Sequence, residues 1–198
     1  MTDFARLMSD YFVKYLAGQK GSGSNTMKTY RDTFVQLLEF MDEKKHIRAD
    51  CIEVDSFSYD IINEFLEYLE KEKRVSISTR NNRLAAIRSF FKYTGYHEPK
   101  YLNISTSIRE ISKKKTEGRQ MNYLSVNAME HFLNSFDKTD HKELRCFCIV
   151  LLLYESGARV TELCNVRRYD LHLEKPYTMI LHGKGDKIRS VPLDGLVA

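Results

Sequence analysis

One stretch of the chain holds residues whose types and spacing suit phosphate chemistry. Arg159 follows an apolar run that is interrupted by Gly157, and a second short helical pattern begins directly after it. The arginine is therefore expected at a break between two helices, because glycine tolerates the positive φ of a helix C-terminus. A planar guanidinium with five donors suits a phosphate, and the N-terminus of the second helix favours an anion too. Glu162, one turn later, is placed to brace the arginine.

A glycine-rich turn follows, between two segments of strand composition. Residues 177–182 and 188–193 are predicted to pair as a β-hairpin. The turn at residues 183–187 then carries Lys184 at an exposed tip, from which a flexible ammonium can reach a neighbouring cleft and donate a proton. The turn is not a phosphate-binding P-loop, because it lacks the upstream glycine and the Ser or Thr after the lysine that this motif needs.

These motifs form an ordered set of three segments: Gly-Ala-Arg-Val-Thr-Glu-Leu at 157–163, Tyr-Asp-Leu at 169–171, and Gly-Lys-Gly-Asp-Lys-Ile-Arg-Ser-Val-Pro-Leu at 183–193. In this order they resemble the first part of the catalytic domain of a tyrosine recombinase, the phage integrase and Xer-type family. The resemblance implies that Arg159 stabilises charge on the non-bridging phosphate oxygens, that Lys184 protonates the leaving 5′-oxygen, and that Glu162 orients Arg159. The Ser-Gly-Ala-Arg variant is similar to that of members carried by transposons, which points to a mobile element.

The resemblance implies DNA integration or recombination by strand exchange, without a metal or a nucleotide cofactor. In such enzymes a tyrosine attacks the scissile phosphate and forms a 3′-phosphotyrosyl intermediate. Members also need a His-x-x-Arg pair, a further His or Trp, and the nucleophilic tyrosine after the hairpin, but the printed sequence stops at Ala198 before any of them. We therefore expect this chain alone to be inactive. The implied partners of a full-length form are double-stranded DNA and other recombinase protomers, as a tetramer on DNA.

The composition is that of a folded protein, since 42% of the residues are hydrophobic and 12% are aromatic. The four cysteines lack the spacing of a disulfide framework and are expected as free thiols in a reducing compartment. No histidine has helical zinc spacing, so no metal site is expected. There is no signal sequence and no apolar segment long enough to span a bilayer. The sequence therefore favours a cytoplasmic protein without a membrane partner.

The charge is unevenly distributed along the chain. A net charge of only +4 does not by itself indicate a nucleic-acid binder. However, residues 76–120 hold ten Lys or Arg against three Glu, whereas residues 42–72 hold ten acidic residues against four basic ones. A local basic zone is the electrostatic footprint expected for binding a polyanion. A merely solvated basic face would have the same composition.

Apolar residues recur at helical spacing in four segments of the first half of the chain, at 3–17, 25–45, 59–72 and 78–93. Short connections between amphipathic helices are typical of a small bundle, and Gly95 is expected to end the fourth helix. The predicted fold is therefore mainly α. It consists of a four-helix bundle, similar to the SAM-like core-binding domain of the family, followed by the start of an α+β catalytic domain with a small antiparallel β-hairpin.

The fourth helix carries polar and basic side chains outside its apolar stripe: Thr79, Arg80, Arg83 and Arg88. Side chains of these types contact phosphates and guanine edges. The helix is similar to the last long helix of the core-binding domain in this family, and the resemblance favours DNA binding over a solvated helix face.

Residues 96–120 are expected to connect the two parts, because they include Pro99, a short polar segment and a basic run. The predicted organisation is a core-binding domain at 1–112, a basic linker at 113–121, and the first part of the catalytic domain at 122–198. Lys113, Lys114 and Lys115 would touch phosphates if the linker crosses the duplex, although a merely soluble linker has the same composition.

Two alternatives to a recombinase remain open from the sequence. One is a non-catalytic DNA-binding fragment that occupies recombination sites without cutting them. The other is a helical module for protein partners, in which the basic face is incidental. DNA affinity at low salt separates the second alternative from the other two interpretations.

Overall fold

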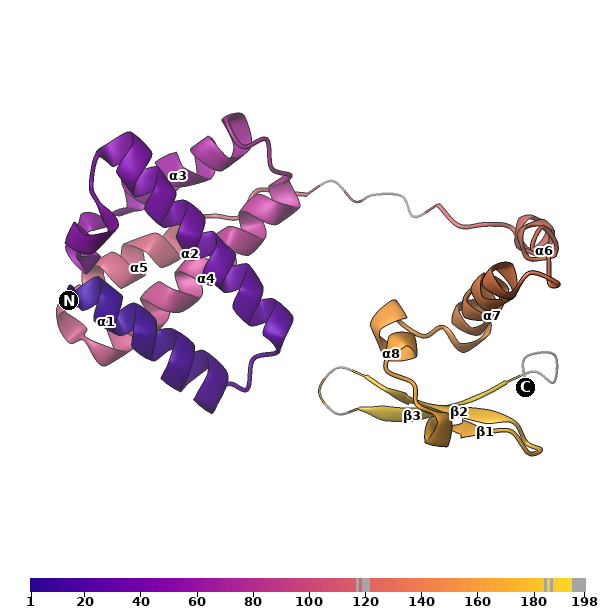
Figure 1. The fold of residues 1–198 in the computed structure, drawn as a ribbon. Coiled ribbons are helices and arrows are strands. Elements are labelled where there is room, and N and C mark those ends of the chain that lie inside the picture. The colour runs from indigo at the N-terminus through magenta and orange to yellow at the C-terminus, as the bar shows by residue number, and fades with distance from the viewer. Residues whose placement is uncertain (117, 119–121, 184, 186, 194–198) are drawn as a thin grey trace. The chain divides into compact units, whose positions relative to one another are not determined.

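The computed structural model describes residues 1–116, 118, 122–183, 185 and 187–193. The contacts divide the chain into two units, residues 1–119 and residues 120–198 (Figure 1). The described residues are mainly helical, and the second unit holds one three-stranded antiparallel sheet. This confirms the predicted fold class. No helix in the described ranges is long and apolar enough to cross a membrane.

The first unit contains the four predicted helices and a fifth. Helix α1 (Asp3–Asp10) continues without a break into a π-helical segment (Tyr11–Gln19). The other helices are α2 (Ser24–Lys45), α3 (Tyr59–Lys71), α4 (Ile77–His97) and α5 (Leu102–Glu110), with single 3₁₀ turns at Ala49–Cys51, Val54–Ser56 and Pro99–Tyr101. Hydroxyl side chains cap the starts of three helices by accepting a backbone hydrogen bond; they are Thr2 before α1, Ser58 before α3 and Ser76 before α4.

The core of the first unit is organised around aromatic side chains. Phe90 of α4 is fully buried, and its ring centroid lies 5.2 to 5.5 Å from the rings of Phe4, Tyr11, Phe34 and Phe91 in edge-to-face geometry. Such pairs add to the free energy of burial. One face of α4 is thereby fixed against α1, the π-helical segment and α2.

Helix α5 corrects the prediction that residues 96–120 form an exposed connection. Ser105, Ile108 and Ile111 are all buried against the bundle. Gly95 does not end α4, which continues to His97; a Cβ at position 95 would lie only 2.6 Å from the Cβ of Ser105. The glycine therefore allows α5 to cross α4 closely. The sequence pattern was misleading because small and polar residues at a helix crossing have the same composition as a linker.

The second unit contains α6 (Val126–Asn134), α7 (His141–Ser156), α8 (Val160–Cys164), a 3₁₀ turn (Arg168–Asp170), and the strands β1 (Leu171–His172), β2 (Thr178–His182) and β3 (Ile188–Pro192). Strand β2 is central and pairs antiparallel with both neighbours. The β2–β3 pairing is the predicted hairpin, and β1 is an additional edge strand. Met179 and Leu181 alternate along β2 and are fully buried.

The apolar composition of residues 147–154, in α7, predicts a buried helix, and this prediction is wrong for the described chain. No residue of α7 is buried, and Ile149 and Tyr154 are 41% and 52% exposed. The small core of this unit is built on Met179, Leu181 and Leu193, with Leu152 as the side chain of α7 that packs against it. Hydrophobic composition predicts what a helix can bury, whereas burial depends on the segments that cover it.

The close crossing of α4 and α5 can be tested with Gly95→Ala. We expect this variant to lose about 1–3 kcal/mol of unfolding free energy, because the new methyl group overlaps Ser105 and the two helices must separate. Urea denaturation followed by far-UV circular dichroism measures the loss. In Gly95→Ala/Ser105→Gly the overlapping atoms are absent, so the double variant should lose less than the two single variants added together. Strictly additive losses would show that the crossing does not require glycine.

Candidate active site and basic surface

Arg159 lies at the break between α7 and α8, where the sequence pattern placed it. Helix α7 ends at Gly157, whose φ of 57° is left-handed, and the N–H of this glycine donates to the carbonyl of Leu153 at 3.1 Å. Arg159 then has extended backbone (φ −72°, ψ 148°) and is the N-cap residue of α8. Its side chain is 69% exposed. The backbone of Arg159 is thus held between two helices while its guanidinium is open to a ligand.

Glu162 is the residue that organises this break. Its side chain is only 4% exposed and accepts three hydrogen bonds: from the backbone N–H of Arg159 at 3.0 Å, from Nη1 of Arg159 at 2.5 Å, and from Nη2 of Arg189 at 2.8 Å. The backbone N–H and then the guanidinium of Arg159, together with Arg189, lower the pKa of Glu162 to about 2, against the opposing effect of burial. The carboxylate is therefore ionised at neutral pH and braces Arg159 as the sequence analysis expected.

Arg189 is a site residue to which the sequence analysis assigned no role. It lies on β3 directly opposite Leu181, and directly opposed residues share one face of an antiparallel pair. Leu181 is buried, so Arg189 is on the face that turns toward the interior of this unit, where it reaches Glu162 and, at 3.4 Å, the carbonyl of Gly157. The strand alternation indicates this inward position for Arg189, although its side chain remains 42% exposed.

A second buried carboxylate, Asp170, lies at the end of the 3₁₀ turn before β1. It is 4% exposed, accepts the backbone N–H of Arg167 at 2.8 Å, and lies 3.2 Å from Nε2 of His182. The hydrogen bond from the Arg167 backbone is the main cause that lowers the pKa of Asp170, with His182 adding to it. His182 is thus the partner of a buried carboxylate.

Lys184, the predicted proton donor, lies outside the described residues. Its described neighbour Gly183 lies close to Glu162, since a Cβ at position 183 would be 3.2 Å from Oε1 of Glu162. The N–H of Gly183 donates to the carbonyl of Lys187 at 2.7 Å. The glycine before the lysine therefore permits a close approach of the hairpin to the carboxylate that braces Arg159.

In the first unit, Arg80 is not a solvated side chain, which corrects the expectation that it lies outside the packed face of α4. It is 5% exposed, and its Nε lies 3.2 Å from Oε1 of Glu70 on α3. Its Nη1 donates to the carbonyl of Ser112 at 3.2 Å. The helix pattern could not reveal this burial, because the counter-charge comes from another helix.

The other predicted DNA-binding residues of α4 also make protein contacts. Arg83 is half-buried in a hollow of about 450 Å³ that is lined by Asp32 and Glu39, and burial lowers the pKa of its guanidinium. Nη2 of Arg88 donates to the carbonyl of Arg109. The hydroxyl of Thr79 lies 2.9 Å from that of Ser76. The structure therefore places these four residues on one helix, but does not leave them as a free basic face.

The three linker lysines differ from one another. Lys113 and Lys115 are exposed and form no hydrogen bond or ion pair with the described residues. Lys114 is held at three points: its Nζ lies 2.8 Å from Glu70, and its backbone N–H and carbonyl bond the side chain of Asn81 at 3.1 Å and 2.8 Å. The bundle therefore fixes the chain up to Lys114, and Glu70 serves both Arg80 and Lys114.

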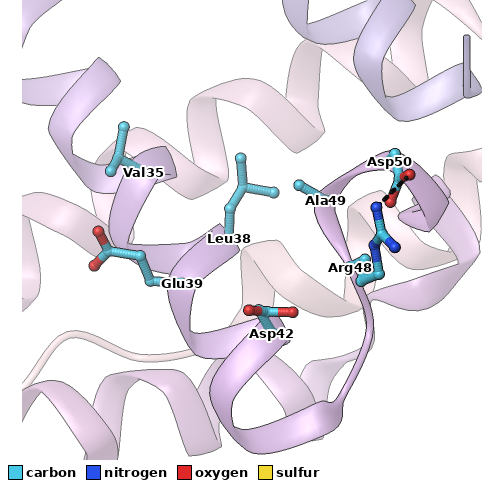
Figure 2. Close-up of a pocket in the computed structure, with 7 residues that line it drawn as sticks. All are labelled: Val35, Leu38, Glu39, Asp42, Arg48, Ala49 and Asp50. Atoms are coloured by element: carbon cyan, nitrogen blue, oxygen red, sulfur yellow. Dashed lines mark hydrogen bonds and ion pairs between the residues drawn. The ribbon is translucent and has the colours of Figure 1, made fainter.

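A hollow of about 600 Å³ lies between α2 and the 3₁₀ turn at 49–51 (Figure 2). Arg48, which lines this hollow, forms an ion pair with Asp50 at 3.2 Å. The other charged residues in the lining are Glu39 and Asp42. This acidic surface repels a polyanion, so we exclude it as a phosphate site. Across the described ranges, no group of three or more His, Cys, Asp or Glu side chains is arranged to hold a metal ion.

Comparisons with known protein families match both units. Residues 10–99 match the N-terminal SAM-like domain of phage integrases, and residues 122–197 match the phage integrase family itself.

Relatives with assigned names agree with these matches. A putative integrase/recombinase y4rD of Sinorhizobium fredii is 29% identical over 190 residues, which are 96% of this chain and 68% of the relative. The tyrosine recombinase XerD of Listeria innocua is 30% identical over 189 residues, which are 93% of this chain and 59% of the relative. This chain thus spans about three fifths to two thirds of the length of these relatives.

Two solved structures share the fold. A XerH site-specific recombinase bound to a palindromic difH substrate superposes with a TM-score of 0.66 at 23% identity, over 96% of this chain and 54% of that one. The integrase of the transposon Tn1549, in complex with circular intermediate DNA, has a TM-score of 0.64 at 20% identity, over 100% of this chain and 62% of that one.

The depressed pKa of Glu162 gives a pH-dependent prediction. A carboxylate with a folded pKa near 2 instead of 4.5 stabilises the fold fully above pH 4.5, and this stabilisation is lost as the pH falls toward 2. Glu162→Gln should therefore lower the thermal unfolding midpoint of the second unit at pH 7, and the difference from the parent should shrink at pH 3. Glu174→Gln, at an exposed carboxylate in the β1–β2 connection, is the matched control. A difference for Glu162→Gln that is equally large at both pH values would contradict the prediction.

Proposed function

Because the chain belongs to the phage integrase family of tyrosine recombinases, we propose that it is the part of a site-specific DNA recombinase that binds DNA and the scissile phosphate. We assign residues 1–112 as the core-binding domain, 113–121 as the linker, and 122–198 as the first part of the catalytic domain. One observation carries the proposal: an exposed guanidinium, Arg159, is fixed at a helix break by a buried, ionised Glu162.

The proposed chemistry is cleavage and rejoining of a DNA strand. A tyrosine hydroxyl forms a bond to the scissile phosphorus, the bond from phosphorus to the 5′-oxygen breaks, and a 3′-phosphotyrosyl intermediate remains. Arg159 stabilises the charge that develops on the non-bridging oxygens. Lys184 gives a proton to the departing 5′-oxygen as general acid. The phosphodiester energy is stored in the covalent intermediate, so rejoining needs no nucleotide cofactor.

We propose double-stranded DNA as the ligand and further protomers, as a tetramer on DNA, as partners. The XerH and Tn1549 integrase structures, which share the fold, are complexes with DNA. Because such a protein acts where the DNA is, we propose a cytoplasmic location. An integrase of a mobile element is the specific role that the Ser-Gly-Ala-Arg segment at 156–159 favours.

The DNA contacts are proposed to differ among the basic residues. Lys113 and Lys115 are exposed and contact phosphates directly. Thr79, Arg83 and Arg88 reach the duplex from α4 by exchanging their present protein contacts for phosphate or base contacts. Arg80 and Lys114 act through their contacts with Glu70, which set the direction in which the linker leaves the bundle.

The salt dependence of DNA binding tests the linker contacts. Each phosphate contact contributes about 0.9 to the slope of log K against log salt concentration. Lys113→Ala/Lys115→Ala should therefore reduce that slope by about 2, as measured by fluorescence anisotropy of a labelled duplex. Lys20→Ala/Lys28→Ala removes the same charge from exposed positions near the start of α2 and is the control. Equal slopes for the two double variants would refute the linker contacts, and no DNA affinity at low salt would favour a protein-interaction module.

The roles of the two proposed catalytic residues can be distinguished with a sulfur-substituted substrate. In a recombinase that contains this chain and the nucleophilic tyrosine, Arg159→Ala and Lys184→Ala should each slow cleavage by roughly 10²–10⁴-fold. A substrate with sulfur at the 5′-bridging position has a leaving group that departs without a proton. It should restore cleavage by Lys184→Ala and leave Arg159→Ala impaired.

Rescue of neither variant, or of Arg159→Ala alone, would refute the general-acid role of Lys184. The 198-residue chain by itself should cut neither substrate, and cleavage by it would show that a tyrosine within residues 1–198 is the nucleophile.

A further inference from the structure

Two buried carboxylates of the second unit make the same pair of contacts. Glu162 accepts the backbone N–H of Arg159, three residues before it, and Asp170 accepts the backbone N–H of Arg167, also three residues before it. Each carboxylate then binds one side chain of the β2–β3 hairpin, Arg189 at 2.8 Å for Glu162 and His182 at 3.2 Å for Asp170. We name these two pairs, Glu162–Arg189 and Asp170–His182, the hairpin anchors.

The two hairpin anchors act at the same end of the hairpin. In the register of β2 and β3, His182 is opposite Ile188 and Leu181 is opposite Arg189, so the anchored residues stand on adjacent rungs. These are the last rungs before the turn at 183–187, and Lys184 follows His182 by two residues. The apolar core of the unit holds the hairpin through Met179 and Leu181, which precede His182 on β2. Polar contacts to buried groups thus hold the end that carries the lysine.

From this arrangement we propose that Arg189 and His182 are positioning residues: they hold the turn end of the hairpin beside Glu162 and Asp170, and proton donation by Lys184 depends on that support. The inference rests on the proposed function, since it assigns the purpose of these contacts to proton donation by Lys184. Reacting groups must be held to within a fraction of an ångström, and a displacement of about 1 Å costs up to roughly 100-fold in rate. A turn that is fixed only by its distant apolar residues would not meet this requirement.

Glu162 has a double role in this scheme. It braces Arg159, which binds the phosphate, and it anchors Arg189, which fixes the strand after the lysine. Loss of Arg189 leaves both contacts between Glu162 and Arg159 in place, so the phosphate-binding group keeps its support. The effect of Arg189 should therefore fall mainly on the proton-transfer step, because among the described residues the only contact with the α7–α8 break that is lost besides Glu162 is the weak one to the Gly157 carbonyl at 3.4 Å.

The decisive measurement is cleavage of the oxygen and 5′-bridging sulfur substrates by a recombinase that contains this chain. Arg189→Ala should slow cleavage of the oxygen substrate by roughly 10- to 100-fold, and sulfur should restore most of this loss. Arg189→Lys should retain more activity, because an ammonium can also pair with Glu162. Glu162→Gln should be rescued only in part, since it weakens both Arg159 and the hairpin anchor. Arg145→Ala, which removes an exposed arginine of α7, is the charge-matched control and should cleave as the parent does.

Amide hydrogen exchange of residues 178–192 in the 198-residue chain provides a test that does not depend on catalysis. Arg189→Ala should speed exchange at the turn end of the hairpin, whereas Arg145→Ala should not. Unchanged exchange, an unchanged oxygen rate, or an equal loss on both substrates would overturn the positioning role. If Lys184→Ala is not rescued by sulfur, the proposed function fails instead, and the exchange result still decides whether the anchors hold the hairpin.

Discussion

A single desolvated carboxylate, that of Glu162, holds the candidate active site together. Burial of an ionised group is unfavourable unless its oxygens are fully hydrogen-bonded, and Glu162 meets this condition with a backbone N–H and two guanidinium groups. Because these donors come from the α7–α8 break and from β3, the carboxylate fixes two segments relative to each other that are distant in sequence. Two positive charges around one negative charge leave a net positive site, which suits a phosphodiester.

The same physical rule distinguishes Arg159, a candidate site residue, from the buried Arg80. Arg159 is bound to a buried carboxylate along one edge and remains 69% exposed, so its remaining donors can reach a phosphate. Arg80 is 5% exposed, forms an ion pair with Glu70, and donates hydrogen bonds to Asn81 and to the carbonyl of Ser112, so its guanidinium is occupied by the protein. Both residues are arginines at the start of a helix. The acidic partner of Arg159 lies on the helix that Arg159 caps, whereas that of Arg80 lies on a neighbouring helix, and only Arg159 stays exposed.

Local sequence signals predicted the elements that depend on local physics. Helical spacing of apolar residues located α1 to α4, and a glycine at the end of an apolar run located the break at Gly157. Strand composition around a glycine-rich turn located the hairpin. The predictions failed where packing between elements decides. Gly95 was expected to stop a helix but lies at a crossing with Ser105, and the polar residues of α5 were expected to form a linker.

The sequence by itself determined the family motifs, the order of the elements, and the identity of Arg159, Glu162 and Lys184 as candidates, because these follow from residue type and spacing along one segment. Only the tertiary structure decided that Arg189 and His182 belong with them, that Arg80 is buried, and that the apolar side chains of α7 are not. The reason is the same in each case. Burial and counter-charge are properties of what lies across the fold from a side chain, and a periodicity read along the chain contains no information about that neighbour.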